Sequence, residues 1–271
     1  RITRRWKAGD TIAIDLPMTL RTEPTPDDPS VLAFANGPLI LAADLGSAAD
    51  PFDGTSPAIL SDGQAGTALK PSGGTQRFQT QGALGETLTF VPFFNQYDRR
   101  TAVYVKAFSP AAWRREKQGY LAAQTESRDL AARTVDIVYL GEMQPERDHG
   151  FAASRGETVQ LHGRSARKLH QDENIRLTLR RRPGPAVLRL TFWGGDIDRQ
   201  FTVAVDGTPF ATVVRGGPGE EAFVSADYPL PSAGEQGRGE AVITFQGLKG
   251  DTDIYEVRMM SAANLPPLQD G

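Results

Sequence analysis

Apolar and polar residues alternate most regularly between Val187 and Val214. In residues 187–193 the apolar set is Leu188, Leu190 and Phe192, a period of two that is typical of a half-buried strand. Residues 201–205 and 210–214 repeat this period, and the Asp-Gly dipeptide at 206–207 favours the positive φ of a tight hairpin. Because residues 194–199 are polar and glycine-rich, the stretch predicts the centre of a β-sandwich with a polar loop at one of its ends.

The same alternation predicts strands along most of the chain. Near the N-terminus, two strands are expected around a turn at 7–10, with apolar residues Ile2, Trp6, Ile12, Ile14, Leu16 and Met18. Further strands are expected at 31–35, 39–43, 86–92, 102–108, 137–140, 158–161, 175–180, 221–224, 241–246 and 255–260. Ser109 followed by Pro110 is typical of a helix start, since a hydroxyl caps the helix and proline suits its first position. A helix is therefore expected over 110–133, with a weak point at Gly119.

This pattern predicts an all-β protein of two β-sandwich (jelly-roll-like) domains joined by a helical connector. The expected bounds are 1–109 for the first sandwich, 110–133 for the connector, 134–262 for a jelly-roll, galactose-binding-like domain and 263–271 for a tail. Residues 46–85 are rich in Gly, Ser, Pro and Asp, and predict a long loop packed on a neighbour. Because Arg1 directly precedes strand residues, the first sandwich is expected to be truncated at its N-terminus.

Composition narrows the range of functions. The chain has 271 residues, an apolar fraction of 39%, a charged fraction of 23% and a formal net charge of −3, so it offers no electrostatic argument for nucleic acid or a membrane as partner. Cysteine is absent, which excludes disulfides, thiolate metal sites and a cysteine nucleophile within this chain. Its sequence contains no nucleophile elbow, phosphate loop, zinc-protease motif or dinucleotide fingerprint.

The densest polar cluster is the segment GEMQPERDH, which contains Glu142, Glu146, Asp148 and His149. These side chains are candidates for binding sugar hydroxyls or a metal ion. The alternative is a solvated loop that enters a sandwich.

A second candidate site combines Trp193 with Asp196, Asp198 and Arg199. A sugar ring stacks its C–H groups on an indole, and its hydroxyls bond to planar polar groups. The alternative is a core or edge tryptophan beside an ordinary loop.

Two further groups are open to both kinds of interpretation. Phe93, Phe94 and Tyr97 lie beside Asp98 and Arg100, where interdomain packing is the alternative to a binding site. Asp251 and Asp253 are candidate ligands for a structural calcium ion, which takes oxygen ligands from loops, or else members of a solvated turn.

Six segments occur in an order that resembles a known family. They are RRWKAGDTIAIDLPM, FANGPLILAADLG, LTFVPFFNQYDRRTAVYVKAF, the helix with Trp113, RTVDIVYLGEMQPERDHGF, and the central stretch with DYPLP. Together they resemble the C-terminal part of glycoside hydrolase family 127 and its relatives, the β-L-arabinofuranosidase-like bacterial enzymes, over nearly the whole chain.

The resemblance implies accessory β domains without an active site. In the family, a cysteine nucleophile and a Glu/Cys zinc cluster sit in an (α/α)₆ barrel that precedes these domains, and nothing here matches them. Gly37, Pro38, Leu39, Glu142, Pro145, Glu146, Asp148 and His149 match as pattern positions only.

The implied role is an inactive C-terminal region that supports the barrel of a glycoside hydrolase and contacts arabinose-containing oligosaccharide, with no cofactor of its own. A free-standing carbohydrate-binding module is the alternative. A periplasmic, secreted or cytoplasmic bacterial location stays open.

Overall fold

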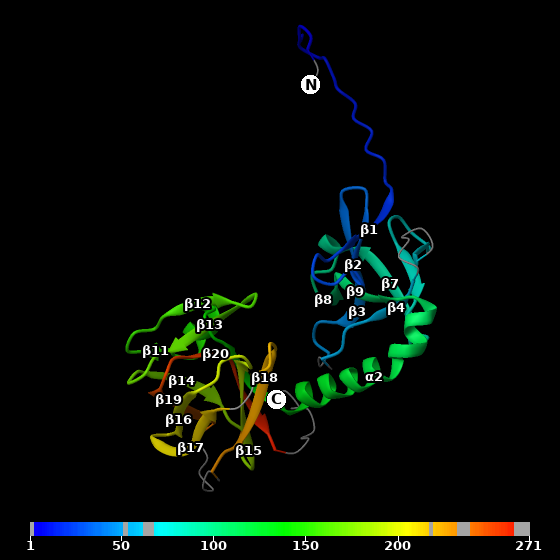
Figure 1. Ribbon diagram of the computed structural model, residues 1–271. Coiled ribbons are helices and arrows are strands. Elements are labelled where there is room, and N and C mark those ends of the chain that lie inside the picture. Colours follow the sequence, from blue (N-terminus) through cyan, green and yellow to red (C-terminus); the bar gives the residue numbers. More distant parts are fainter. Residues whose placement is uncertain (1–2, 51–53, 62–67, 217–218, 232–238, 263–271) are drawn as a thin grey trace. The chain divides into compact units, whose positions relative to one another are not determined.

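A computed structural model describes residues 3–50, 54–61, 68–216, 219–231 and 239–262. The chain divides into two compact units, Arg1–Arg128 and Asp129–Gly271, and most of its regular structure is β-strand (Figure 1). The all-β class is therefore confirmed. The expected connector is shared between the units, since the helix α2, Pro110–Arg133, crosses the boundary between them.

Within the described residues of unit 1, the strands are hydrogen-bonded into one sheet. Its strands are β1 (Leu20–Pro24), β2 (Val31–Asn36), β3 (Leu39–Ser47), β4 (Ala58–Leu60), β5 (Lys70–Pro71), β6 (Phe78–Gln81), β7 (Thr87–Pro92), β8 (Arg99–Ala102) and β9 (Tyr104–Phe108), with a 3₁₀ turn η1 at Phe93–Asn95. The order is β4-β9-β2-β3-β7-β6-β5, with β1 paired to β2 and β8 to β3. A bridge between Ile59 and Gly82 links β4 to the end of β6, so the sheet curls back on itself.

The core of unit 1 corrects the expectation for residues 46–85. This segment contributes β4, β5 and β6, and its apolar side chains Ile59, Leu69 and Phe78 are buried in the core with Phe34 and Phe90. Few apolar residues in a glycine-rich segment suggested a loop, yet each of these three lies at a position that faces inward. Residues 51–53 and 62–67 lie outside the described part of the chain.

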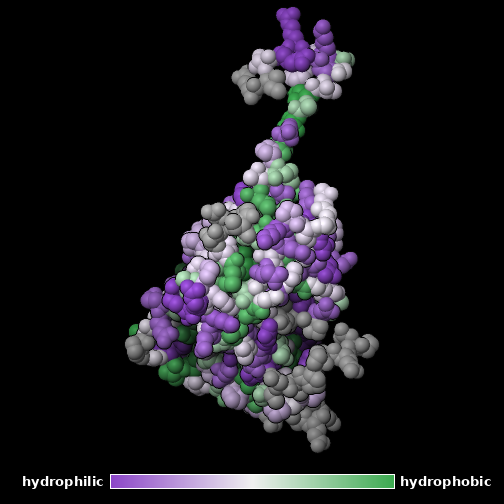
Figure 2. Space-filling view, turned by 90° about the vertical axis from the view of Figure 1, so that its right-hand side faces the viewer, coloured by the Kyte–Doolittle hydropathy of each residue, from purple (hydrophilic) through white to green (hydrophobic). Residues whose placement is uncertain are grey.

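The expectation of strands within residues 1–18 is wrong for the described part. Residues 3–19 form no strand, although the turn is present, with Asp10 N donating to Lys7 O at 3.0 Å. Ile12, Ile14 and Leu16 are exposed, and Figure 2 shows apolar side chains along this extended segment. A strand requires a partner to satisfy its backbone groups, and alternation in sequence does not supply one.

Helix α2 begins as the sequence predicts. The Ser109 hydroxyl accepts from Ala112 N at 3.1 Å, and Trp113 is buried against Phe108 with Tyr120 at the edge of both rings. The helix continues through Gly119 without interruption. One glycine costs roughly 1 kcal/mol relative to alanine, which packing of the apolar face offsets.

Unit 2 is a β-sandwich of two antiparallel sheets. Its elements are β10 (Thr134–Tyr139), α3 (Met143–Asp148), β11 (Ala152–Ala153), β12 (Thr158–Leu161), β13 (Arg164–Leu169), β14 (Asn174–Arg180), β15 (Ala186–Trp193), β16 (Arg199–Val205), β17 (Thr208–Arg215), β18 (Phe223–Pro229), β19 (Glu240–Lys249) and β20 (Thr252–Ser261). One sheet has the order β12-β13-β20-β15-β18, with β10 also paired to β20, and the other has the order β11-β14-β19-β16-β17.

The core of unit 2 lies between these sheets and contains Leu188, Leu190, Phe192, Phe201 and Phe245. The Asp206-Gly207 turn closes the β16–β17 hairpin with φ of 48° and 82°, as the dipeptide predicts. Strands β11 and β13 and helix α3 were not expected from the sequence. The expected tail, 263–271, lies outside the described residues.

Candidate functional site

The outer face of one sheet in unit 2 carries Trp193. Because Leu188, Leu190 and Phe192 of β15 point into the core, the alternate residues of this strand point to the opposite face. Register then places Trp193 beside Phe223 of β18. The next pairs along the two strands are Thr191 with Ser225, whose hydroxyls are 2.9 Å apart, and Arg189 with Asp227, an ion pair at 2.6 Å.

Trp193 is the centre of an aromatic cluster at one end of this face. The His162 ring stacks on the indole with 3.6 Å between centroids and 7° between planes. Phe223 meets Trp193 edge-on at 5.2 Å, and Tyr255 meets Phe223 edge-on at 4.9 Å. The Arg164 guanidinium lies 4.7 Å from the centre of the Phe223 ring. We call His162, Trp193, Phe223, Tyr255 and Arg164 the Trp193 platform.

His162 reaches Trp193 from a hairpin turn that the sequence analysis did not identify. His162 and Gly163 join β12 to β13 with φ of 53° and 77°, so both residues are left-handed. Histidine is one of the non-glycine residues that adopt this conformation more often than most. The dipeptide His-Gly, directly after the strand expected at 158–161, was the available signal.

The polar loop that follows Trp193 folds back toward it. Asp196 N donates to Trp193 O at 3.2 Å, and the side chain of Asp196 points inward, with Oδ2 buried. Asp198 instead pairs with Lys249 at 2.5 Å, which holds the pKa of that exposed carboxyl below its usual range. Arg199 lies against Gly250. A cavity of about 280 Å³ adjoins the loop, lined by Gly194, Asp196, Ile197, Val214, Arg215, Gly216, Glu220 and Val224.

Glu146 is buried beneath Arg167. The guanidinium donates to both carboxylate oxygens, at 2.7 and 2.6 Å, and Gly141 N donates to one of them at 2.7 Å. Glu146 thus anchors the turn that leads from Gly141 into α3, and its buried carboxylate points into unit 2.

His149 and Asp148 lie beside a separate cavity of about 560 Å³, which Asp136, Gly150, Thr178, Arg180 and Glu240 also line. His149 Nδ1 faces Pro145 O at 2.6 Å, and Nε2 faces Asp136 at 3.2 Å. Burial alone would raise the pKa of Asp136, but hydrogen bonds from Arg180 and His149 outweigh it and hold this pKa below its usual value. Both ring nitrogens of His149 thus face an oxygen atom of the same unit.

The structure does not bring the two candidate clusters together. The His149 cavity includes Arg180 and Glu240, which are register partners at the first residue of β19. The Trp193 loop lies at the other end of that strand, where Asp198 pairs with Lys249. The ten-residue length of β19 separates them.

The two aspartates considered for calcium also separate. Asp251 is exposed and faces His170 Nδ1 at 3.0 Å, whereas Asp253 is buried.

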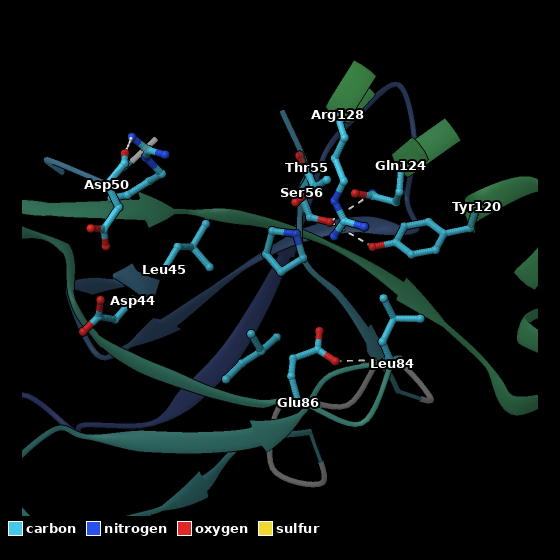
Figure 3. Close-up of a pocket in the computed structure, with 13 residues that line it drawn as sticks. Asp44, Leu45, Asp50, Thr55, Ser56, Leu84, Glu86, Tyr120, Gln124 and Arg128 are labelled. Carbon is cyan, nitrogen blue, oxygen red and sulfur yellow. Dashed lines mark hydrogen bonds between the residues drawn. The ribbon is translucent and has the colours of Figure 1, made fainter. Parts of the chain in front are cut away.

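In unit 1, Phe93, Phe94 and Tyr97 expose about half or more of their surface. Arg100 donates to Asp50 O at 2.6 Å and lines a different cavity, of about 470 Å³ (Figure 3). In that cavity Tyr120 and Gln124 both donate to Ser56 O, at 2.9 and 3.2 Å. The bonds tie α2 to the loop before β4.

The described residues hold no group of three or more His, Cys, Asp or Glu side chains placed to share a metal ion. No helix among them has the length and apolar character needed to cross a membrane.

Comparison of the sequence with family models gives one match. A family of unknown function, DUF6805, matches residues 129–260, which is most of unit 2. No curated protein sequence matches the chain.

Solved structures show weak similarity. A family GH115 4-O-methyl-α-glucuronidase with specificity for decorated arabinogalactans is 12% identical, with a TM-score of 0.35, over 41% of this chain and 17% of that one. A family 35 carbohydrate-binding module from Clostridium thermocellum is 13% identical, with a TM-score of 0.33, over 41% of this chain and 92% of the module. The C-terminal family 6 carbohydrate-binding module of a laminarinase from Zobellia galactanivorans is 10% identical, with a TM-score of 0.36, over 46% of this chain and 98% of the module. At these values the likeness carries no argument about what this chain binds.

Proposed function

We propose that unit 2 binds carbohydrate at the Trp193 platform. We further propose that the chain is an accessory, non-catalytic C-terminal region of a family 127-like glycoside hydrolase that acts on arabinose-containing glycans. The observation that carries the binding proposal is the His162 ring seated flat on Trp193. A sugar ring stacks on an indole through its C–H face in the same way, so the indole is available from this side when His162 turns away.

The surroundings of the indole support this role. Asp196 and Glu220 line the cavity that adjoins the 194–199 loop, and the Arg164 guanidinium lies over the Phe223 ring of the platform. Charged planar groups form the strong bidentate hydrogen bonds that fix a sugar's orientation. Trp193 itself is half-buried, which fits a ring that is held by its neighbours and contacted from outside.

The accessory role draws support from unit 1. Its segment 11–18 exposes alternating apolar side chains, and its exposed aromatic residues Phe93, Phe94 and Tyr97 add apolar surface. Exposed apolar groups of this kind are typical of surfaces that contact another domain. In this proposal the catalytic barrel of the same protein covers them.

Calorimetry with arabino-oligosaccharides tests the binding proposal. Trp193→Ala is expected to weaken binding by about 5- to 150-fold, since base or sugar stacking on an aromatic ring contributes roughly 1–3 kcal/mol. Trp6→Ala is the matched control, because Trp6 is an exposed tryptophan of the 3–19 segment and its loss should leave affinity unchanged. Equal affinities for Trp193→Ala and the parent chain would contradict the proposal.

The absence of catalysis has its own test. The chain should release no product from an aryl β-L-arabinofuranoside, because it carries no thiolate nucleophile. Turnover above a buffer blank would contradict this part. The coding sequence upstream of Arg1 distinguishes the two hypotheses for the chain. An accessory region requires an upstream helical barrel with a Glu/Cys cluster, and a free-standing carbohydrate-binding module does not.

A further inference from the structure

Four side-chain oxygens near the Trp193 platform are buried and have no hydrogen-bond partner among the described residues. They are Asp196 Oδ2, Thr252 Oγ1, Asp253 Oδ1 and Tyr255 OH. Tyr255 and Thr252 are each 1% exposed, and Asp253 is 8% exposed. A buried polar group without a hydrogen-bond partner is destabilising, and a buried carboxylate more so, so four such oxygens in one region require an explanation.

Strand register places three of these oxygens together. Ile254 of β20 points into the core and pairs with Phe192, so Asp253 and Tyr255 point to the outer face beside Trp193. The turn in which Asp196 N donates to Trp193 O brings Asp196 to the same place. Tyr255 is fixed there through its ring contact with Phe223.

Electrostatics agree with this placement. Burial raises the pKa of Asp253, and the charge of Asp196 raises it further, while Lys168 acts in the opposite direction. Burial also raises the pKa of Tyr255, to about 12, with further contributions from Asp253 and Asp196. Both effects agree with carboxylates that lie on the same side of β20 as the phenol.

The cationic side chains around this position are engaged elsewhere. Arg215, which lines the Asp196 cavity, donates to Trp193 O at 3.0 Å. Arg164 lies over the Phe223 and Tyr255 rings, and Lys168 pairs with Glu157 at 3.5 Å. Lys249 pairs with Asp198 on the outside of the loop. Among the described residues, no guanidinium or ammonium group is bonded to Asp196 Oδ2 or Asp253 Oδ1.

We propose that Asp196 and Asp253 bind a hard divalent cation of the calcium type, with the Tyr255 hydroxyl directed at the same point. The donor set consists of oxygen alone, which favours Ca²⁺ over softer metals. Since only two carboxylates contribute, the affinity resembles that of extracellular calcium modules, with Kd on the order of 10⁻⁴–10⁻³ M. The ion would hold the 193–196 turn against β20 and so fix the rim of the platform.

Thermal unfolding with CaCl₂, after removal of metal with EDTA, tests the site in the full chain without any carbohydrate. At 10 mM Ca²⁺ the parent Tm for unit 2 is expected to rise by about 3–10 °C, as mass action predicts for such a Kd. Asp253→Asn and Asp196→Asn should each abolish the rise, and calorimetry should show the heat of binding only in the parent. Asp198→Asn is the matched control, because Asp198 lies on the same loop but faces Lys249, and it should keep the full rise.

Thermal unfolding in EDTA, without added Ca²⁺, checks that the variants fold. Without metal, Asp253→Asn should unfold at or above the parent Tm, since it removes a buried carboxylate that lies beside Asp196. Two outcomes would overturn the proposal. One is a parent chain that shows neither a Ca²⁺-dependent rise nor a binding heat. The other is a rise that persists when Asp196 and Asp253 are both replaced by asparagine.

Discussion

His162 and Trp193 stack with their ring planes 7° apart and their centroids 3.6 Å apart, so the imidazole lies flat on one face of the indole. Aromatic pairs prefer offset or edge-on arrangements over a face-to-face stack. The imidazole is exposed and comes from a two-residue turn, while Trp193 is anchored in β15. Histidine is therefore the member of the pair that a ligand would displace.

His162→Asn should tighten carbohydrate binding. Asparagine keeps the left-handed turn, because Asn-Gly is the preferred dipeptide there, and it removes the ring that covers Trp193. If a sugar displaces the imidazole, affinity rises about 2- to 12-fold, the equivalent of roughly 0.5–1.5 kcal/mol for an aromatic pair. Calorimetry measures the change. His170→Asn is the control, since His170 lies between Glu157 and Asp251, and weaker binding by His162→Asn would contradict the displacement.

The sequence predicted the central strands of unit 2 well because their alternation is regular. Leu188, Leu190 and Phe192 all face the core, as their period of two required. Strand β13 was missed because the alternation is hidden in RSARKL, where Arg167 points inward to pair with Glu146. A charged residue at an inward position is recognisable only when its buried partner is known.

The candidate site was predicted in part. Trp193 and Asp196 were chosen for their chemistry, and the structure places both at one end of a sheet face. His162, Phe223 and Tyr255 join them through strand pairing between segments 30 to 90 residues apart, which no local pattern reports. His149 lies elsewhere for the same reason, since its distance from Trp193 depends on the register of β19. Glu146 instead points to Arg167 of β13.

Arg167→Met should destabilise unit 2 strongly. The change leaves the Glu146 carboxylate, 5% exposed, without its bidentate partner, and removing one member of a buried ion pair costs about 3–5 kcal/mol. Urea unfolding followed by circular dichroism measures the loss. The control is Lys249→Met in the exposed pair with Asp198, where the loss should stay below about 1 kcal/mol. Similar losses in both variants would mean that Glu146 is not held mainly by Arg167.

Asp136 should contribute to acid sensitivity. Its pKa in the folded chain is held below the ordinary value of 3.8, because hydrogen bonds from Arg180 and His149 outweigh the effect of burial. A lowered folded pKa adds stability that is present above the unfolded pKa and is lost as pH falls through the folded value. Below about pH 4 the parent chain should therefore lose stability that Asp136→Asn never had. Urea unfolding at a series of pH values measures this, and the free energies of unfolding of parent and variant, plotted against pH, should converge there. Parallel curves from pH 7 to pH 3 would contradict this assignment.

Gly141→Ala tests the turn that leads from β10 into α3. Gly141 has φ of +84°, and an added Cβ would lie 2.9 Å from both Ala166 N and Ser165 Cβ, so the substitution combines a left-handed backbone with a clash. We expect a loss of about 2–5 kcal/mol, the sum of the backbone penalty and of overpacking. Gly163→Ala is the matched control, because φ is +77° there but no atom lies within 4 Å of the new Cβ. It should lose only about 1–2 kcal/mol.

Gly141 is also coupled to the buried ion pair, because Gly141 N donates to Glu146. Gly141→Ala should therefore weaken the contact between Glu146 and Arg167. A double-mutant cycle of Gly141→Ala with Arg167→Met should report a coupling of at least about 0.5 kcal/mol. Additive losses in that cycle would show that the turn and the buried ion pair act independently.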